Sequence, residues 1–169
     1  MDALQAILTR RSIRRYEPTP VTEDQLKDLL EAAMAAPSAG NQQPWHFIVV
    51  TERRTLDAIA AVHPHAQMLK EAPAAVVVCG DTTSLRHVDF WVQDCAAAVQ
   101  NILLAATALG LGSCWVGVHP RAERETALRG VFNFPESIVP VAVVALGHGA
   151  EVKGPALRYQ EERVHRERW

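Results

Sequence analysis

The chain has 169 residues, 49% of them hydrophobic and 21% charged, and a formal net charge of -2 at pH 7. These values are ordinary for a soluble globular domain, and a chain of this length can bury roughly 70% of its unfolded surface. The near-neutral charge argues against nucleic acid as the main partner, because such binding depends on a broad basic field. We therefore expect one domain over residues 1–169, with no internal repeat and no domain linker.

The cysteines and the apolar segments bear on the location of the protein. Cys79, Cys95 and Cys114 lie far apart in apolar stretches, and their odd number without a C-x-x-C motif predicts reduced, buried thiols in a cytoplasmic protein. The N-terminus has no continuous apolar region, so we expect no signal peptide. Residues 95–120 carry no charged side chain and exceed the ~20 residues of a membrane span. Polar residues and glycines interrupt them, however, and we predict a buried helix followed by a buried strand, with no membrane association.

A short helix is expected over residues 2–9, and the next segment reads Arg10-Arg11-Ser12-Ile13-Arg14-Arg15. If this segment is extended, Arg10, Ser12 and Arg14 share one face and the other three residues share the opposite face. Two guanidinium groups that flank a hydroxyl suit a phosphate or another compact dianion. The alternative is a solvated basic patch near the N-terminus.

Thr22 and Gln25 form a capping box at the start of a second helix, whose leucines recur at helical spacing. Pro37 disfavours helix at Ala36, so the helix is expected to end there. The following loop, Pro37 to Trp45, is built from Pro, Ser, Gly, Asn and Gln. Its amides on a constrained backbone suit recognition of the edge of a flat heterocycle, although such loops are also common as simple connectors.

Four apolar runs predict buried strands over residues 47–50, 74–79, 113–116 and 139–146. Helical patterns predict further helices over residues 56–60, 67–71, 87–109 and 120–130. The order of these elements lacks regular βαβ alternation, which favours an α+β sandwich over a doubly wound sheet. After Gly147 the composition changes, and residues 151–169 form a mostly charged tail that ends in Trp169.

The helix over residues 87–109 is apolar or small on nearly every face. A helix of this kind must be enclosed on all sides, which one small domain can hardly do alone. We therefore predict that a partner subunit covers it, and its alanines would let two backbones approach closely. The alternative is a central helix within a monomer.

Several chemistries find little support in the sequence. Gly110-Leu111-Gly112 lacks the third glycine of a dinucleotide-binding motif and follows a helix rather than a strand. The chain has no Walker A motif and no G-x-S-x-G nucleophile motif. His63 and His65 are the only close histidine pair, and nothing of matching spacing completes a metal site. We expect no metal.

Three blocks in this order resemble the FMN-dependent nitroreductase family, in its compact branch. They are Arg10 to Tyr16, Ala36 to Phe47 and Gly110 to Gly117, and the charged tail to Trp169 also matches. The resemblance covers essentially the whole chain. It implies an α/β/α sandwich with a central mixed, mostly antiparallel sheet and an intertwined homodimer. In such a dimer, residues 150–169 would form an arm that packs on the partner subunit.

The resemblance also implies a site for FMN at the subunit interface. Arg10 and Arg158 would pair with the phosphate, and Arg14 would lie near the ribityl or pyrimidine side, where a cation eases hydride acceptance. Larger relatives carry a Lys-x-Arg pair in the tail, whereas Lys153 and Arg158 lie five residues apart here, and we favour Arg158. Four further residues expected at the cofactor would come from the other subunit, namely Pro37, Ser38, Ala39 and Asn41. The others expected there are Arg11, Ser12, Gln67, Trp115, Val116, Gly117, Gly147 and His148.

Some of these positions have particular roles by resemblance. Gly117 would direct its amide N–H at flavin N5, the atom that receives hydride. Gln67 stands where better-known relatives often carry a basic residue. Phe90 and Trp91 would cover the substrate side, although core packing is the alternative for both.

The implied activity is an FMN oxidoreductase with a ping-pong mechanism. NAD(P)H would reduce the flavin and leave, and an electron-poor acceptor such as a nitroaromatic or quinone would then be reduced. No side chain is nominated as catalytic. One rival is a family relative that fragments flavin or removes halogen reductively, and the other is a non-enzymatic protein that binds an anion.

Overall fold

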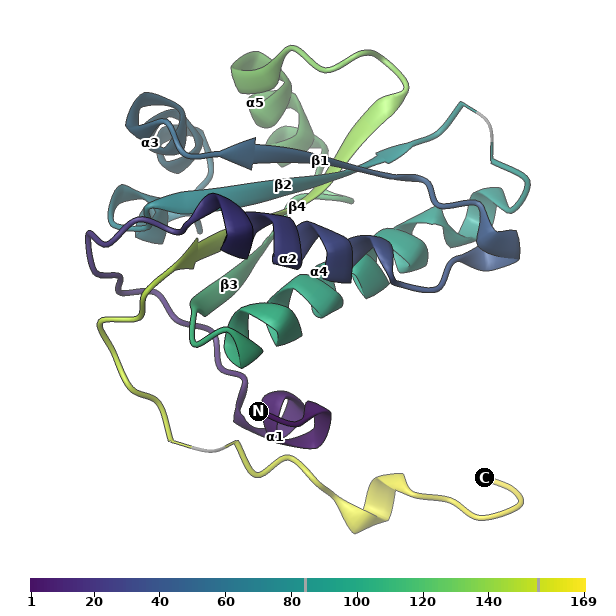
Figure 1. Ribbon diagram of the computed structural model, residues 1–169. Helices are drawn as coiled ribbons and strands as arrows, with labels where there is room; N and C mark the ends of the chain where they lie inside the picture. Colours follow the sequence, from purple (N-terminus) through teal and green to yellow (C-terminus); the bar gives the residue numbers. More distant parts are fainter. Residues whose placement is uncertain (84, 155) are drawn as a thin grey trace.

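The computed structural model describes residues 1–83, 85–154 and 156–169, and its centre is one four-stranded sheet (Figure 1). The strands follow the order β1-β2-β4-β3, and each neighbouring pair is antiparallel. The bounds are β1 (Trp45–Val50), β2 (Ala74–Asp81), β3 (Gly112–Gly117) and β4 (Ile138–Gly147). The four predicted strands are confirmed, each within two residues of its expected ends. The sheet is antiparallel throughout the described residues rather than mixed, apart from one isolated parallel bridge outside the named strands.

Helices cover both faces of this sheet. The helices are α1 (Ala3–Thr9), α2 (Glu23–Met34), α3 (Arg53–Val62), α4 (Trp91–Ala108) and α5 (Ala122–Phe132). In Figure 1, α2 and α4 lie on one face, and α3 and α5 lie on the other. Each layer buries its own apolar cluster against the sheet, one built on α2 and α4 and one built on α3 and α5. The predicted α/β/α sandwich is confirmed.

Local signals explain where the helices begin and end. Thr22 caps α2, and the reciprocal hydrogen bonds with Gln25 form the expected capping box. α2 ends at Met34, close to the predicted end. Regular α-helix begins at Trp91 rather than at residue 87, because Val88–Phe90 form a 3₁₀ turn, η3. Three further 3₁₀ turns are η1 (Ala39–Asn41), η2 (Gln67–Lys70) and η4 (Glu161–Arg163).

The central strands and the thiols are buried as expected. β2 and β4 are almost entirely enclosed, which matches their continuous apolar sequences. The three cysteines are free and buried, and burial raises the pKa of Cys79 and of Cys95 to about 12. Among the described residues, no helix is both long and apolar enough to cross a membrane.

Two parts of the chain remain uncovered. α4 buries one side against the sheet and α2, while Ala97, Leu104 and Ala105 on its other side stay half-buried. The tail over residues 156–169 lies away from the sheet and runs past α1 (Figure 1). Its large apolar side chains are exposed, namely Leu157, Tyr159, Val164 and Trp169, and Trp169 is 100% exposed.

Candidate functional site

The arginine segment lies against the start of β3, an edge strand of the sheet. A parallel bridge joins Ser12 to Ser113, and the Ile13 amide donates to the Ser113 carbonyl at 3.0 Å. The segment then leaves β3, because the Arg14 amide donates to Glu151 Oε1 at 2.5 Å instead. Beyond Ser113, the outer edge of β3 therefore faces a cavity rather than another strand.

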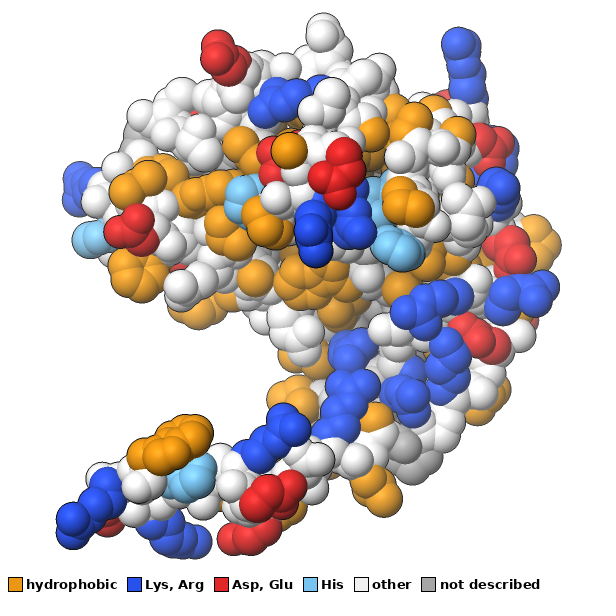
Figure 2. All heavy atoms as spheres, turned by 180° about the vertical axis from the view of Figure 1, so that it is seen from behind, with side chains coloured by type: hydrophobic (Ala, Val, Ile, Leu, Met, Phe, Trp, Pro, Cys, Tyr) orange, Lys and Arg blue, Asp and Glu red, His pale blue; other side chains and the backbone are white. Residues whose placement is uncertain are grey.

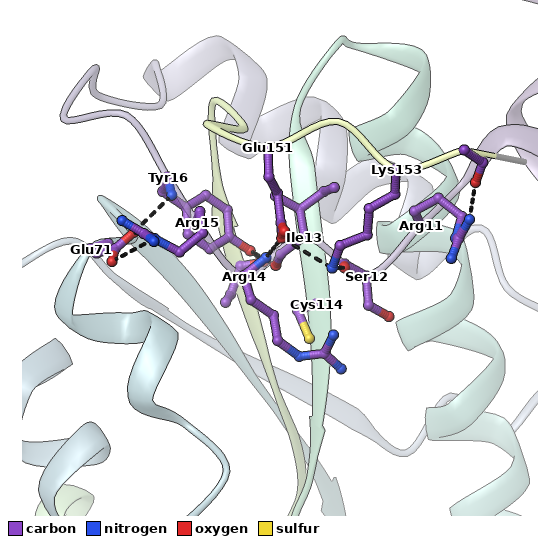
Figure 3. A network of polar contacts seen from close by, with 12 residues as sticks. Arg11, Ser12, Ile13, Arg14, Arg15, Tyr16, Glu71, Cys114, Glu151 and Lys153 are labelled. Carbon is purple, nitrogen blue, oxygen red and sulfur yellow. Dashed lines mark hydrogen bonds and ion pairs between the residues drawn. The ribbon is translucent and has the colours of Figure 1, made fainter.

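The arginines divide into two groups, as the extended segment predicts. Arg11 donates to the Gly154 carbonyl, and Arg15 Nε pairs with Glu71 at 2.9 Å (Figure 3). The guanidinium group of Arg14 points the other way, toward Cys114 (Figure 3). Within the described residues, no hydrogen bond or ion pair engages the guanidinium group of Arg10 or Arg14. These two cations are therefore available to a ligand.

Two carboxylates hold the backbone of the arginine segment, and the sequence analysis missed both. Glu71 accepts from the Arg15 side chain and from the Tyr16 amide at 3.2 Å, and these contacts hold its pKa below the usual value. The Arg14 amide and then Lys153 lower the pKa of Glu151 in the same way. No spacing could have revealed these partners, because the contacts span 55 and 137 residues.

The structure brings Lys153 into this cluster and leaves Arg158 outside it. Lys153 Nζ donates to the Ser12 carbonyl at 2.6 Å and lies 3.1 Å from Glu151. Arg158 belongs to the exposed tail, and among the described residues no hydrogen bond or ion pair joins it to this cluster. Figure 2 shows Lys and Arg side chains gathered on the surface that leads from the body to this tail.

A pocket of about 640 Å³ follows the free edge of β3. The residues around it come from the arginine segment, the end of α3, η2 and β3. They are Arg14, Arg15, Pro64, His65, Gln67, Met68, Glu71, Cys114, Trp115, Val116 and Gly117. The pocket thus contains five of the predicted cofactor residues. Burial raises the pKa of the Cys114 thiol, which favours a role for this side chain in core packing over a role as a nucleophile.

The backbone of β3 presents polar groups to this pocket. The carbonyl of Ser113 points outward to Ile13, and the carbonyl of Gly117 points outward to Arg124. Alternate residues of a strand turn their amide groups to the same side, so the N–H groups of Trp115 and Gly117 also face the free edge. A Cβ at Gly117 would meet nothing within 4 Å. Packing does not require glycine there, and its absent side chain leaves room for a close ligand.

Gln67 presents an acceptor at the mouth of the pocket. Its Nε2 donates to the Ala60 carbonyl at 2.8 Å, which fixes the side chain against the end of α3. No hydrogen bond among the described residues uses the amide oxygen, which can therefore accept from a ligand N–H. A second polar atom, the buried Ser113 Oγ, has no hydrogen-bond partner among the described residues.

The predicted loop lies elsewhere in the same chain. Residues 37–44 precede β1, at the opposite edge of the sheet, and none of them contributes to the pocket. Three strand spacings separate the two edges, or about 14 Å. The loop is fastened to α4 by Asp94, which is 5% exposed and accepts from the Ala39 amide at 2.9 Å and from Gln42 Nε2 at 2.8 Å. The sequence did not point to Asp94, because no sequence motif links this residue to a loop that lies 52 to 55 positions earlier in the chain.

The loop itself is rigidly shaped. The Gln42 side chain pairs with the backbone of His87 through two hydrogen bonds. Ser38 Oγ accepts from the Gln43 amide at 3.0 Å, and Asn41 adopts a left-handed φ of 53°. Pro37 is exposed, and Ala39 is half-buried. The structure therefore presents this loop as a preformed surface, but not to the pocket of its own chain.

Four remaining predicted residues occupy other parts of the fold. Gly147 pairs with Gly112, at the arginine-segment end of β3, and a Cβ there would lie 2.5 Å from Pro73. The His148 carbonyl accepts from Glu17 beside it. These two residues are therefore not next to Gly117, whose partner is Ala142.

Phe90 and Trp91 stand at the start of α4. Trp91 packs against the His119 ring with centroids 4.9 Å apart, and it covers Gly80. Phe90 is 46% exposed. Packing within the fold thus explains most of the position of the Trp91 side chain, whereas the Phe90 side chain is exposed and could contact a ligand or a partner.

Comparisons with known proteins agree with this geometry. The model of the nitroreductase family matches residues 7–83 and 57–148. A protein of Methanothermobacter thermautotrophicus, provisionally named an NADH dehydrogenase/NAD(P)H nitroreductase, is 47% identical over all of this chain and 88% of its own length. An FMN-dependent nitroreductase from Clostridium difficile superposes with a TM-score of 0.91 at 28% identity, over 98% of this chain and 99% of that one.

A further solved structure bears on the cofactor. A provisionally assigned nitroreductase from Desulfovibrio desulfuricans, solved in complex with FMN, is 33% identical and superposes with a TM-score of 0.86. That match covers 100% of this chain and 98% of the other. From its sequence, its fold and these relatives, the chain belongs to the nitroreductase family of oxidoreductases.

Proposed function

We propose that this protein is an FMN-dependent oxidoreductase that passes hydride from NAD(P)H to an electron-poor acceptor of nitroaromatic or quinone type by a ping-pong mechanism. The observation that carries the proposal is the pocket along the free edge of β3, whose lining includes the unengaged guanidinium group of Arg14 and the open backbone of Gly117. Its volume of about 640 Å³ suits a flat ring system with a short chain.

The residues present fit FMN. Arg10 and Ser12 would bind the phosphate, since a free guanidinium beside a hydroxyl matches a dianion. Lys153 lies at the same place, and Arg158 would reach it from the tail. Gln67 offers an acceptor that suits the N3–H of the pyrimidine edge.

When bound, FMN would supply N5, an atom that can accept a hydride from NAD(P)H and pass it to the acceptor. The Gly117 N–H would orient the ring by its contact with N5. Arg14 would place positive charge beside the pyrimidine side as negative charge arrives there. The acceptor would receive one hydride, and water would supply the one proton that completes a two-electron product. No side-chain acid or base is needed in this scheme.

We further propose that the working unit is a homodimer. The loop over residues 37–43 cannot reach the pocket of its own chain, and a second copy would bring it there. α1 exposes Leu4, Ile7 and Leu8, and an apolar groove of about 440 Å³ lies between α1, α2 and α4. The exposed apolar residues of the tail also call for a surface to cover them, and the part of the arm over residues 156–169 would pack on the partner, because Glu151 and Lys153 contact the arginine segment of their own chain.

The experiment is the visible spectrum of the purified protein, before and after anaerobic addition of NADH or NADPH. We expect a yellow protein whose flavin band bleaches with either or both nucleotides and returns when a nitroaromatic or a quinone is added. A protein that stays colourless after incubation with FMN contradicts the cofactor. A flavin that bleaches but is never reoxidised by these acceptors points to another reaction of the family.

A further inference from the structure

His63 is a buried histidine that has no place in the proposed contacts with FMN. It follows the last residue of α3, where its amide donates to the Ile59 carbonyl, and it is 1% exposed. A buried imidazole needs partners for both ring nitrogens. One of the two partners of the His63 ring is Gly117, the residue that ends β3 at the pocket.

The two hydrogen bonds define the state of this imidazole. The His65 amide donates to Nδ1 at 3.2 Å, so Nδ1 is an acceptor. Burial lowers the pKa of His63 below its usual value, which favours the neutral ring at neutral pH. The single proton therefore sits on Nε2, which donates to the Gly117 carbonyl at 3.1 Å.

The Gly117 carbonyl has a second donor. Arg124, in the first turn of α5, donates to it through a guanidinium nitrogen at 2.8 Å. Side chains from the end of α3 and the start of α5 thus meet on one backbone oxygen, and together they use both of its lone pairs.

Gly117 needs such support. It is the last residue of β3, and the next two amides, those of Val118 and His119, both donate to the Val141 carbonyl, so the regular ladder ends there. Glycine is the residue with the greatest backbone freedom, and no strand among the described residues pairs with the outer edge of β3 at Gly117. The two donors hold the peptide plane that follows Gly117, and through the shared Cα they restrict the orientation of the preceding plane, which carries the Gly117 N–H.

We infer that His63 is a positioning residue, which together with Arg124 fixes the Gly117 backbone so that the Gly117 N–H stays directed at N5 of bound FMN. This inference rests on the proposed function. His63 does not line the pocket, so it would act on bound FMN only through Gly117. A small displacement of a group that orients the reacting atom can slow a reaction by orders of magnitude.

The test compares His63→Phe with His63→Gln, each as the FMN-loaded protein. Phenylalanine keeps a ring but cannot donate, whereas the glutamine amide can place a donor where Nε2 stood. FMN labelled with ¹⁵N at N5 reports directly on a hydrogen bond to that atom. We expect the N5 resonance of His63→Phe to move toward its value in an aprotic solvent, and that of His63→Gln to stay near the wild-type value.

Hydride transfer gives a second readout. In anaerobic stopped flow, we expect His63→Phe to reduce its flavin about tenfold more slowly than wild type at saturating NAD(P)H, with little change in half-saturation. Leu128→Ala is the control for lost stability, since Leu128 is fully buried in α5 and its aliphatic side chain donates no hydrogen bond to the Gly117 carbonyl. It should leave both the resonance and the rate unchanged.

The possible outcomes separate the inference from the proposed function. If wild type binds FMN and His63→Phe keeps the wild-type resonance and rate, the inference is overturned and the proposed function stands. If Leu128→Ala shifts both readouts as much as His63→Phe does, the effect is general destabilisation and the inference is also overturned. If wild type binds no FMN, the proposed function itself is wrong.

Discussion

At the scale of single residues, the arginine segment separates structural cations from available ones. Arg11 and Arg15 are engaged by Gly154 and Glu71, whereas Arg10 and Arg14 have no described partner. Alternation along an extended segment predicted this partition. The identity of the engaging groups could not be predicted, because the partner carboxylate and carbonyl come from distant parts of the chain.

The Arg10→Ala variant tests the phosphate assignment. A hydrogen bond to a charged group is worth about 1.5–3 kcal/mol, so we expect the Kd for FMN to rise about 10- to 150-fold. Riboflavin lacks the phosphate, and its affinity should not change. Fluorescence titration with both flavins measures this, with Arg54→Ala on the exposed face of α3 as the control. Equal losses for FMN and riboflavin would place Arg10 away from the phosphate.

Asp94 gives a second prediction at this scale. Its replacement by alanine leaves the Ala39 amide and the Gln42 side chain without their acceptor, which costs about 1–3 kcal/mol for each buried donor that stays unpaired. We expect a lower thermal midpoint and weaker FMN binding, because the loop loses its shape. Asp28→Asn, on the exposed side of α2, is the matched control. Wild-type flavin affinity in Asp94→Ala would show that the loop has no part in the site.

At the scale of elements, hydrophobic periodicity and helix-capping residues were sufficient to predict most of the helices and strands. Continuous apolar runs gave the buried strands, and the Thr22–Gln25 pair gave the start of α2. Sequence patterns could not reveal that β3 is an edge strand, since strand order depends on long-range pairing. The functional meaning of Trp115 to Gly117 depends on that free edge. The placement of Gly147 and His148 away from Gly117 likewise follows from the register of β3 and β4.

The two carboxylates under the arginine segment predict an acid-sensitive element. The pKa values of Glu71 and Glu151 are lowered in the folded protein, so their stabilising contribution is present above their ordinary value near 4.5 and is lost as the pH falls through the folded values. We expect the thermal midpoint to drop below about pH 4.5.

Variants show whether these two groups are responsible. Glu71→Gln and Glu151→Gln should each lower the midpoint at pH 6 and flatten its fall toward pH 3, as measured by thermal melts in a pH series. Glu31→Gln, whose side chain is exposed on α2, is the control. An unchanged pH profile in both variants would mean that other carboxylates dominate acid unfolding.

At the scale of the whole molecule, a single chain leaves apolar surfaces uncovered and its site incomplete. α4 is covered on one side only, as its nearly uniform apolar sequence suggested, and α1 and the tail expose large apolar side chains. Composition could reveal this excess of apolar surface. It could not place the loop and the arginine segment at opposite edges of the sheet, which follows from the topology.

Charges on α1 should disrupt the proposed dimer. Leu8 is 68% exposed in the single chain, and we expect Leu8→Glu to yield a monomer because a buried unpaired carboxylate is costly at an apolar interface. Light scattering measures the mass, and absorbance measures the bound flavin, which should be lost with the dimer. Gln5→Glu, at an exposed position of α1 outside the apolar groove, is the control and should remain dimeric. A flavin-loaded monomer of Leu8→Glu would contradict the shared site.

The most direct test of the account is a mixed dimer of Arg10→Ala and Asp94→Ala chains, isolated through two different affinity tags. If the arginine segment of one chain meets the loop of the other, one of the two sites contains neither lesion. We predict one tightly bound FMN per mixed dimer, reducible by NAD(P)H, whereas each variant alone binds FMN weakly. A mixed dimer that binds FMN as weakly as its parents would contradict a site built from two subunits.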